Sequence, residues 1–160
     1  MTTVLLFTAL SFAAESLPSG GENVVTSQVT VSCSLEEAQR HLANAEQMAL
    51  LSPDVLTAKS APQGTCQRMT VAVKGLLSPM RYVSERCPTA KGYTERLVSS
   101  DDFTEQSTDW ELKSVAGGTL VTLRIRAMPK MPVPDAIVFS KVKSSSLATL
   151  ERFSALVTGD

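Results

Sequence analysis

Few residues of this chain are suited to covalent or acid–base catalysis. His41 is the single histidine, so a Ser-His-Asp triad or a histidine-activated cysteine would have to use it, and no nucleophile motif lies near it. The three cysteines lack the spacing of metal ligands, and there is no glycine-rich phosphate loop. We therefore expect neither a metal nor a cofactor.

Glu95 is the best candidate for a general acid or base. It lies beside Arg96 in the alternating segment GYTERLV, so one of the two side chains can point inward, where a charge needs a partner or a ligand head group. If Glu95 is buried with a raised pKa, it can transfer protons. The other interpretation is a charged strand edge, and both stay open here.

Cys66 and Cys87 bracket a predicted β-hairpin, TCQRMTVAVKGLLSPMRYVSERC, with its turn at residues 75–78. Pairing the residues on either side of this turn sets the register of the whole hairpin. The apolar residues then collect on one face, where Val71 pairs with Tyr82 and Met69 with Ser84. On the other face Arg68 pairs with Glu85, which carries the opposite charge.

The same register places Cys66 opposite Cys87, within the separation that a disulfide requires. In an oxidising compartment the bond would form and add about 3 kcal/mol to stability. The alternative is two free thiols on a cytosolic sheet. Cys33 is left over and is expected to be buried.

Further alternating segments predict more strands of an antiparallel sheet. Residues 24–33 read as a half-buried strand, and residues 34–53 as one or two short helices capped by Ser34. A second hairpin turns at residues 117–118 and pairs Trp110 with Leu123, while Asp109 meets Arg124 on the outer face.

Residues 135–158 predict one long helix after the proline-rich segment MPKMPVPD. Its apolar stripe, which includes Val142 and Leu150, has Ser146 at its centre. One explanation is that a small residue lets the helix approach the sheet, with the hydroxyl bonded to its own turn. The other is that Ser146 faces a cavity and meets a ligand or water.

The order of elements resembles the helix-grip fold of the START/polyketide-cyclase (SRPBCC) superfamily. The resemblance covers residues 24–157 and rests on three segments: VTVSCSLEEAQRHLANAEQMALLSP, GGTLVTLRIRAMP and PVPDAIVFSKVKSSSLATLERF. It implies an α+β fold in which a curved antiparallel sheet wraps the C-terminal helix around an apolar cavity. The implied lining is Met69, Val71, Tyr82, Ser84, Trp110, Leu123, Val142, Ser146 and Leu150.

Because this superfamily shares no catalytic motif, the resemblance transfers no catalytic residue. It favours a non-enzymatic carrier of a lipid or other hydrophobic small molecule. Residues in the 50s and 60s and the segment MPKMPVP are expected to open for the ligand, with transient contact to a membrane surface. The alternatives are a polyketide cyclase or dehydratase that uses the same cavity, and a protein-interaction module.

The remaining expectations concern organisation and location. One domain is expected at residues 22–160, behind a leader and linker at residues 1–21 whose apolar run has the length of a signal peptide. A secreted or periplasmic protein is the first expectation and a cytoplasmic one the alternative. The net charge of −1, with scattered basic residues, argues against nucleic-acid binding. A monomer is expected.

Overall fold

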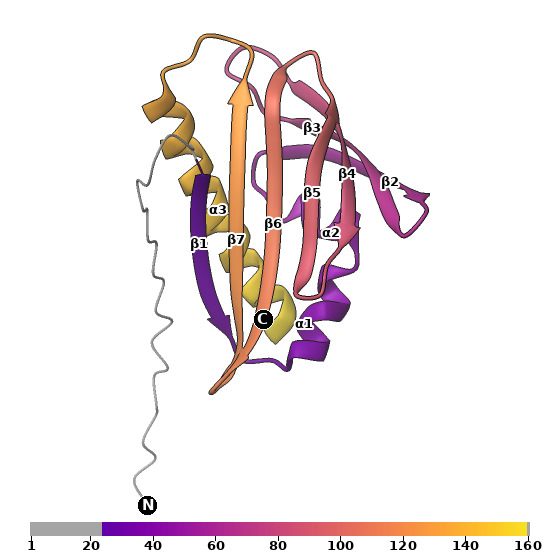
Figure 1. Ribbon diagram of the computed structural model, residues 1–160. Coiled ribbons are helices and arrows are strands. Elements are labelled where there is room, and N and C mark those ends of the chain that lie inside the picture. Colours follow the sequence, from indigo (N-terminus) through magenta and orange to yellow (C-terminus); the bar gives the residue numbers. More distant parts are fainter. Residues whose placement is uncertain (1–23, 160) are drawn as a thin grey trace, which may run out of the picture.

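Residues 24–159 form an antiparallel sheet of seven strands with three helices on one face. The computed structural model describes residues 24–159, and the expected leader lies outside them (Figure 1). The strand order is β1-β7-β6-β5-β4-β3-β2. The strands are β1 Val24–Val31, β2 Val55–Gln63, β3 Cys66–Val73, β4 Met80–Pro88, β5 Gly92–Ser99, β6 Phe103–Val115 and β7 Gly118–Pro129; the helices are α1 Leu35–Leu42, α2 Ala45–Leu50 and α3 Asp135–Thr158. This is the predicted helix-grip α+β fold.

Both predicted hairpin registers are confirmed. In β3–β4, Met69 faces Ser84, and in β6–β7, Trp110 faces Leu123. Alternation fixed these pairings, since a slip of one residue would turn every apolar side chain toward water. One side-chain detail differs: Asp109 faces Arg124 in the register, yet its carboxylate pairs with Arg96 of the neighbouring strand β5 at 2.7 Å.

The segment between β1 and β2 forms two helices because it carries two N-caps. The Ser34 hydroxyl accepts a hydrogen bond from the backbone N–H of Glu37 at 3.2 Å, as predicted. The Asn44 side chain accepts a hydrogen bond of 3.2 Å from the backbone N–H of Gln47 and is the N-cap of α2. Residues 55–63, expected to open for a ligand, are instead the edge strand β2, which pairs with β3.

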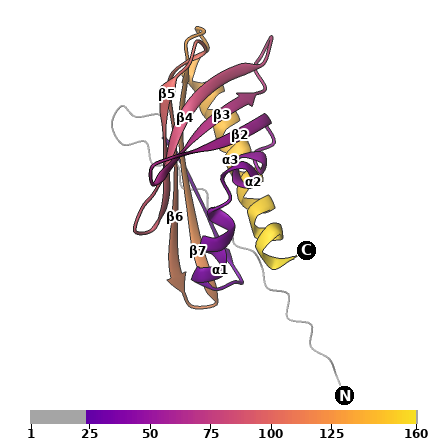
Figure 2. The same cartoon turned by 90° about the vertical axis from the view of Figure 1, so that its right-hand side faces the viewer.

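Helix α3 crosses the concave face of the sheet, and Figure 2 shows α1, α2 and α3 on the same side of it. Its C-terminal half is the buried half, with Ser146, Thr149, Leu150, Phe153 and Val157 inside. The N-terminal half is more exposed, because the apolar stripe there has fewer partners on the sheet. Among residues 24–159, no helix combines the length and hydropathy that a bilayer span requires.

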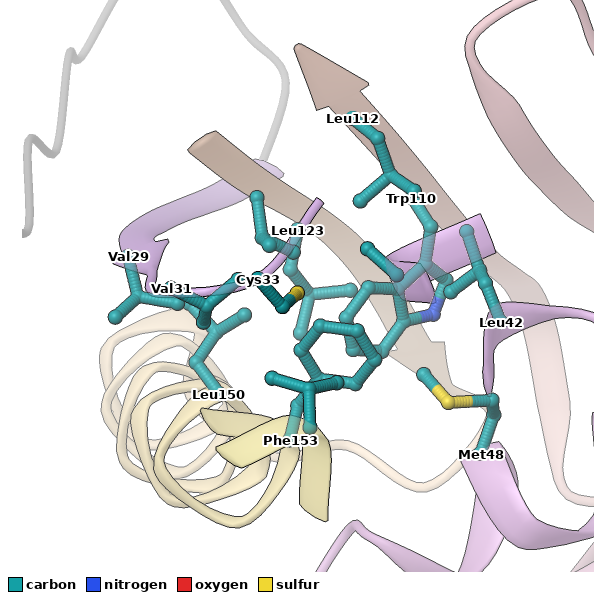
Figure 3. Packing of buried hydrophobic residues seen from close by; sticks show 13 residues of the cluster. Val29, Val31, Cys33, Leu42, Met48, Trp110, Leu112, Leu123, Leu150 and Phe153 are labelled. Carbon is teal, nitrogen blue, oxygen red and sulfur yellow. The ribbon is translucent and has the colours of Figure 1, made fainter. Parts of the chain in front are cut away.

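Two clusters of apolar side chains form the core. The larger lies between α3, α1 and the strands β1, β6 and β7, where the Trp110 and Phe153 rings pack with centroids 5.6 Å apart (Figure 3). The smaller comprises Ala45, Met69 and Val71 and lies beneath α2. Replacing a buried Phe or Trp with Ala typically costs about 3–5 kcal/mol, so Trp110 and Phe153 are major contributors to stability.

The predicted disulfide is present. Cys66 and Cys87 are bonded, with their Cα atoms 4.3 Å apart, at the end of the β3–β4 hairpin remote from its turn. Cys33 is a free, buried thiol, also as predicted. The disulfide ties β3 covalently to β4 at this end of the hairpin.

Candidate ligand-binding site

A pocket of about 220 Å³ lies between the N-terminal half of α3 and the sheet. It is bounded by the β3–β4 loop, the strands β4, β6 and β7, and the β7–α3 loop. Its apolar border is formed by Val73, Leu76, Met80, Tyr82, Phe103, Ile125, Ala127, Pro129, Met131, Val133, Ile137, Val138 and Val142. Its polar side chains are Asp54, Lys74, Gln106, Thr108, Lys141 and Ser145.

The pocket exists because α3 packs tightly on the sheet only in its C-terminal half. Toward its N-terminus the helix offers Val138 and Val142, which are half-buried and do not fill the space above Ile125 and Ala127 of β7. Such concave, mostly apolar pockets are the usual binding sites for small molecules.

One wall of the pocket is aromatic. The Tyr82 ring meets Phe103 edge-on, with centroids 5.7 Å apart. Burial raises the pKa of the Tyr82 phenol well above its ordinary value, so the group stays protonated and can donate a hydrogen bond. An apolar ring with a polar tip can both pack against a ligand and orient it.

The sheet side of the pocket carries two polar side chains of β6. Gln106 is only 8% exposed, and its Nε2 donates a hydrogen bond of 3.1 Å to Oγ1 of Thr108. Its other amide atom, Oε1, is buried and has no hydrogen-bond partner among the described residues. Buried polar atoms are nearly always paired, so this unpaired acceptor is an exception in the polar part of the wall.

Glu95 lies next to this polar wall without bordering the pocket. It faces Thr108 across the β5–β6 pairing and accepts a hydrogen bond of 2.6 Å from the hydroxyl of Ser84. Burial raises the pKa of Glu95, and the Ser84 hydrogen bond and the charge of Arg86 oppose that rise. Of the two sequence interpretations, the inward-facing carboxyl is the one that the structure shows.

Arg86 is the cation nearest in register to Glu95 and is 3% exposed. Its Nη2 donates to the carbonyl of Leu42 at the end of α1, and its guanidinium stacks 3.8 Å from the centroid of the Tyr93 ring. Burial lowers the pKa of Arg86. Arg86 therefore connects the end of α1 to the sheet. Its Nη1 atom has no hydrogen-bond partner within residues 24–159.

The mouth of the pocket is unusually apolar for a surface. Leu76 is 63% exposed, Ile137 52% and Met131 41%, and Leu77 beside them is 89% exposed. The β3–β4 loop turns tightly at Gly75, where a Cβ atom would clash with the carbonyl of Ser78. An ion pair of 3.0 Å between Lys141 and Asp54 borders the opening.

The predicted lining residues fall into different surroundings. Tyr82 and Val142 border the pocket. Trp110, Leu123 and Leu150 lie in the large core cluster, where Phe153 and the α1 side chains fill the space between sheet and helix.

The other predicted residues also have protein partners. Met69 and Val71 pack against Ala45 in the smaller cluster, and the hydroxyls of Ser84 and Ser146 bond to Glu95 and Ser27.

Sequence reasoning missed most of the residues that border the pocket, among them its inward-facing polar pair on β6, Gln106 and Thr108. Their signal was present, since two inward-facing polar residues precede Trp110 at intervals of two along β6. A separate group, Cys66, Glu85 and Cys87, lies close enough to share an ion. Both sulfur atoms are used in the disulfide, so this group has no thiolate to offer a metal.

The fold has many counterparts among solved structures. A START superfamily protein from Mycobacterium smegmatis superposes with a TM-score of 0.73 at 16% identity, covering 85% of this chain and 97% of that one. A fragment of a STAR-related lipid transfer protein from Xanthomonas axonopodis gives 0.69 at 16% identity, covering 93% and 98%. An aromatase/cyclase from Streptomyces sp. R1128 gives 0.71 at 16% identity, covering 84% and 93%.

At these identities the likenesses show the START-like helix-grip fold. No protein-family model matches the sequence, and no curated protein matches it.

Proposed function

We propose that this protein is a non-enzymatic carrier that binds a lipid or other hydrophobic small molecule in the pocket beneath α3. The observation that carries the proposal is the pocket itself, whose border is mainly apolar and whose mouth exposes Leu76, Met131 and Ile137. Burial of a ligand's apolar surface supplies the binding energy, at roughly 25 cal/mol for each Å². The lipid transfer protein with the same fold supports this reading.

We propose that the ligand enters the pocket between the two loops at its mouth. These are the β3–β4 loop, residues 74–79, and the β7–α3 loop, residues 130–134, which includes part of the predicted segment MPKMPVP. Neither loop belongs to a strand, and each is held at its first residue by a backbone hydrogen bond, from Lys74 to Asp54 and from Lys130 to Asp102, so movement is assigned to the residues that follow.

The test is a native mass spectrum of the purified chain, before and after extraction with organic solvent. A carrier shows extra mass that extraction removes. Ala127→Trp places a large ring inside the pocket and should abolish the extra mass, whereas Ala155→Trp on the exposed side of α3 should keep it. A chain without extra mass that also fails to take up any added apolar compound contradicts the proposal.

We also propose that the mouth touches a membrane surface when the ligand is exchanged. Leu76 and Leu77 on one loop, Met131 on the other and Ile137 on α3 are exposed apolar side chains. Exposed apolar patches of this kind mark interaction sites, and a bilayer is both the partner and the source of an apolar ligand.

The second candidate is an enzyme, a cyclase or dehydratase acting in the same pocket. The observation that favours it is Glu95, a carboxyl that lies behind Thr108 of the pocket wall and whose pKa is raised by burial. The aromatase/cyclase with the same fold is consistent with it. Turnover of a polyketide-like substrate that Glu95→Gln abolishes, with binding retained, would establish the enzyme over the carrier.

We propose export to the periplasm or the medium as the setting, and a monomer as the working form. A disulfide between Cys66 and Cys87 persists most readily in an oxidising compartment, which supports export. The intact mass of the protein recovered from the extracytoplasmic fraction would test both the cleavage of a leader and the bond, and sedimentation velocity would test the monomer.

A further inference from the structure

The hydroxyl of Tyr82 is an unused hydrogen-bond donor at the pocket. Tyr82 borders the pocket and is half-buried, and within residues 24–159 its hydroxyl has no hydrogen-bond partner. Side-chain atoms that are both unpaired and fully buried occur at Gln106 and Arg86 but not at Tyr82, so this hydroxyl is accessible. Protein surrounds the phenol closely enough to raise its pKa. The accessible part of the hydroxyl therefore opens onto the pocket.

The hydroxyl of Thr108 is a second donor at the border. Its Oγ1 accepts the hydrogen bond of 3.1 Å from Nε2 of Gln106, and in the described part of the chain its own proton has no acceptor. Two side-chain groups at the border can only accept, the carboxylate of Asp54 and Oε1 of Gln106. The first is paired with Lys141 at the mouth, and the second is fully buried. The free polar groups of the pocket are thus donors, and a matching ligand supplies an acceptor.

The acceptor that fits is an uncharged oxygen. A carboxylate carried as far as Tyr82 would need a cation or several donors beside it. The cations that border the pocket, Lys74 and Lys141, are exposed at its mouth. Arg86 does not border the pocket and interacts electrostatically with Glu95, which it faces in register. A carbonyl oxygen, by contrast, is satisfied by one or two hydroxyl donors.

The volume limits the size of what can be enclosed. An apolar cavity of about 150 Å³ suffices for one benzene ring, and this pocket has about 220 Å³. One ring, or a short chain of similar volume, fits inside together with a carbonyl group. A longer tail would extend through the mouth, over Leu76, Met131 and Ile137.

We propose that the pocket takes an uncharged apolar ketone or ester whose carbonyl oxygen accepts a hydrogen bond from the hydroxyl of Tyr82. This inference rests on the proposed binding function and narrows it to a ligand class. The apolar part of the ligand packs against Phe103, Ile125 and Val142, which border the same pocket.

The test uses two probes that differ at one carbon, butyrophenone and butylbenzene, titrated calorimetrically into the full-length chain. Tyr82→Phe removes the hydroxyl and keeps the ring. It should weaken the binding of butyrophenone about tenfold, the effect of losing one buried hydrogen bond, and change that of butylbenzene by about twofold or less. Tyr93→Phe is the matched control, since Tyr93 is the other tyrosine of the chain and does not border the pocket. It should leave the binding of both probes unchanged.

The infrared band of the bound carbonyl gives a second readout, which a general change in packing does not imitate. The stretching frequency of isotope-labelled butyrophenone should be lower in the wild type than in Tyr82→Phe, because a donor weakens the carbonyl bond. Equal losses of affinity for both probes, or a frequency that Tyr82→Phe leaves unchanged, overturn the inference alone. If neither probe binds the wild type, the proposed carrier function falls with it.

Discussion

The hydroxyl of Ser146 on α3 donates a hydrogen bond of 2.9 Å to the hydroxyl of Ser27 on β1. Both side chains are completely buried. The serine in the middle of the apolar stripe therefore joins the helix to the sheet at a point where both elements carry a small residue. Of the two sequence interpretations, neither the bond to its own turn nor an opening to the pocket is found for Ser146. A bond of the first kind is made three residues later, where the Thr149 hydroxyl donates to the carbonyl of Ser145 at 2.8 Å.

Ser146→Ala should lower the free energy of unfolding by about 1–3 kcal/mol, because it leaves the Ser27 hydroxyl buried without its partner. Denaturant unfolding measures this change. The double variant Ser27→Ala/Ser146→Ala should be more stable than the sum of the two single changes predicts. Ser144→Ala, on the exposed side of α3, should change little. Additive losses in the double variant would show that the two hydroxyls are not coupled.

Glu95 should make the protein less stable as the pH rises. Its pKa in the folded chain is raised above its ordinary value of 4.5, so the folded state holds a proton that the unfolded state has lost. Stability therefore declines as the pH increases from about 4.5 through the raised pKa. In Glu95→Gln, which can still bond to Ser84, this decline should be smaller when unfolding is measured across the acid-to-neutral range.

Glu111 provides the matched control for that pH experiment. Its hydrogen bond with Arg124 lowers its pKa from 4.5, so its contribution is present at neutral pH and is lost only as the pH falls through that lowered pKa. Glu111→Gln should leave the slope above pH 4.5 unchanged. If Glu95→Gln leaves the dependence of unfolding free energy on pH unchanged, the pKa of Glu95 is not raised in the folded chain.

Replacing both bonded cysteines, Cys66→Ser with Cys87→Ser, should lower the free energy of unfolding by about 3 kcal/mol, since the open chain gains entropy when unfolded. Thermal and denaturant unfolding measure the loss. In the unreduced wild type, only Cys33 should react with an alkylating reagent, and only after unfolding, because it is buried and burial raises its pKa. Two further reactive thiols in the unfolded, unreduced chain would contradict the disulfide.

Leu77→Asp should weaken binding to phosphatidylcholine liposomes about tenfold or more, because an 89% exposed leucine at the mouth would no longer enter the bilayer. Co-sedimentation with the liposomes measures the bound fraction. Leu50→Asp adds the same charge at another exposed leucine, on α2 and away from the pocket, and should bind as the wild type does. Equal losses in both variants would assign the effect to net charge.

The sequence was sufficient for these two hairpins because their strands alternate and a recognisable turn joins each pair. The pairs of Met69 with Ser84 and Trp110 with Leu123 follow from alternation alone. The pocket could not be located in the same way. Alternation shows that Trp110 and Gln106 share a face, but one is covered by Phe153 and the other borders empty space. The difference depends on where α3 stops packing against the sheet. The local pattern of residues in β6 does not predict that position.

The Cys66–Cys87 bond also has a mechanical consequence. It fastens one end of the β3–β4 hairpin, and the loop at the mouth of the pocket is the opposite end. One end of the hairpin is thus held by a covalent bond, whereas the loop at the other end is not. Under the proposed binding function, movement of residues 74–79 would admit the ligand, while the paired strands between the two ends keep the wall of the pocket in place.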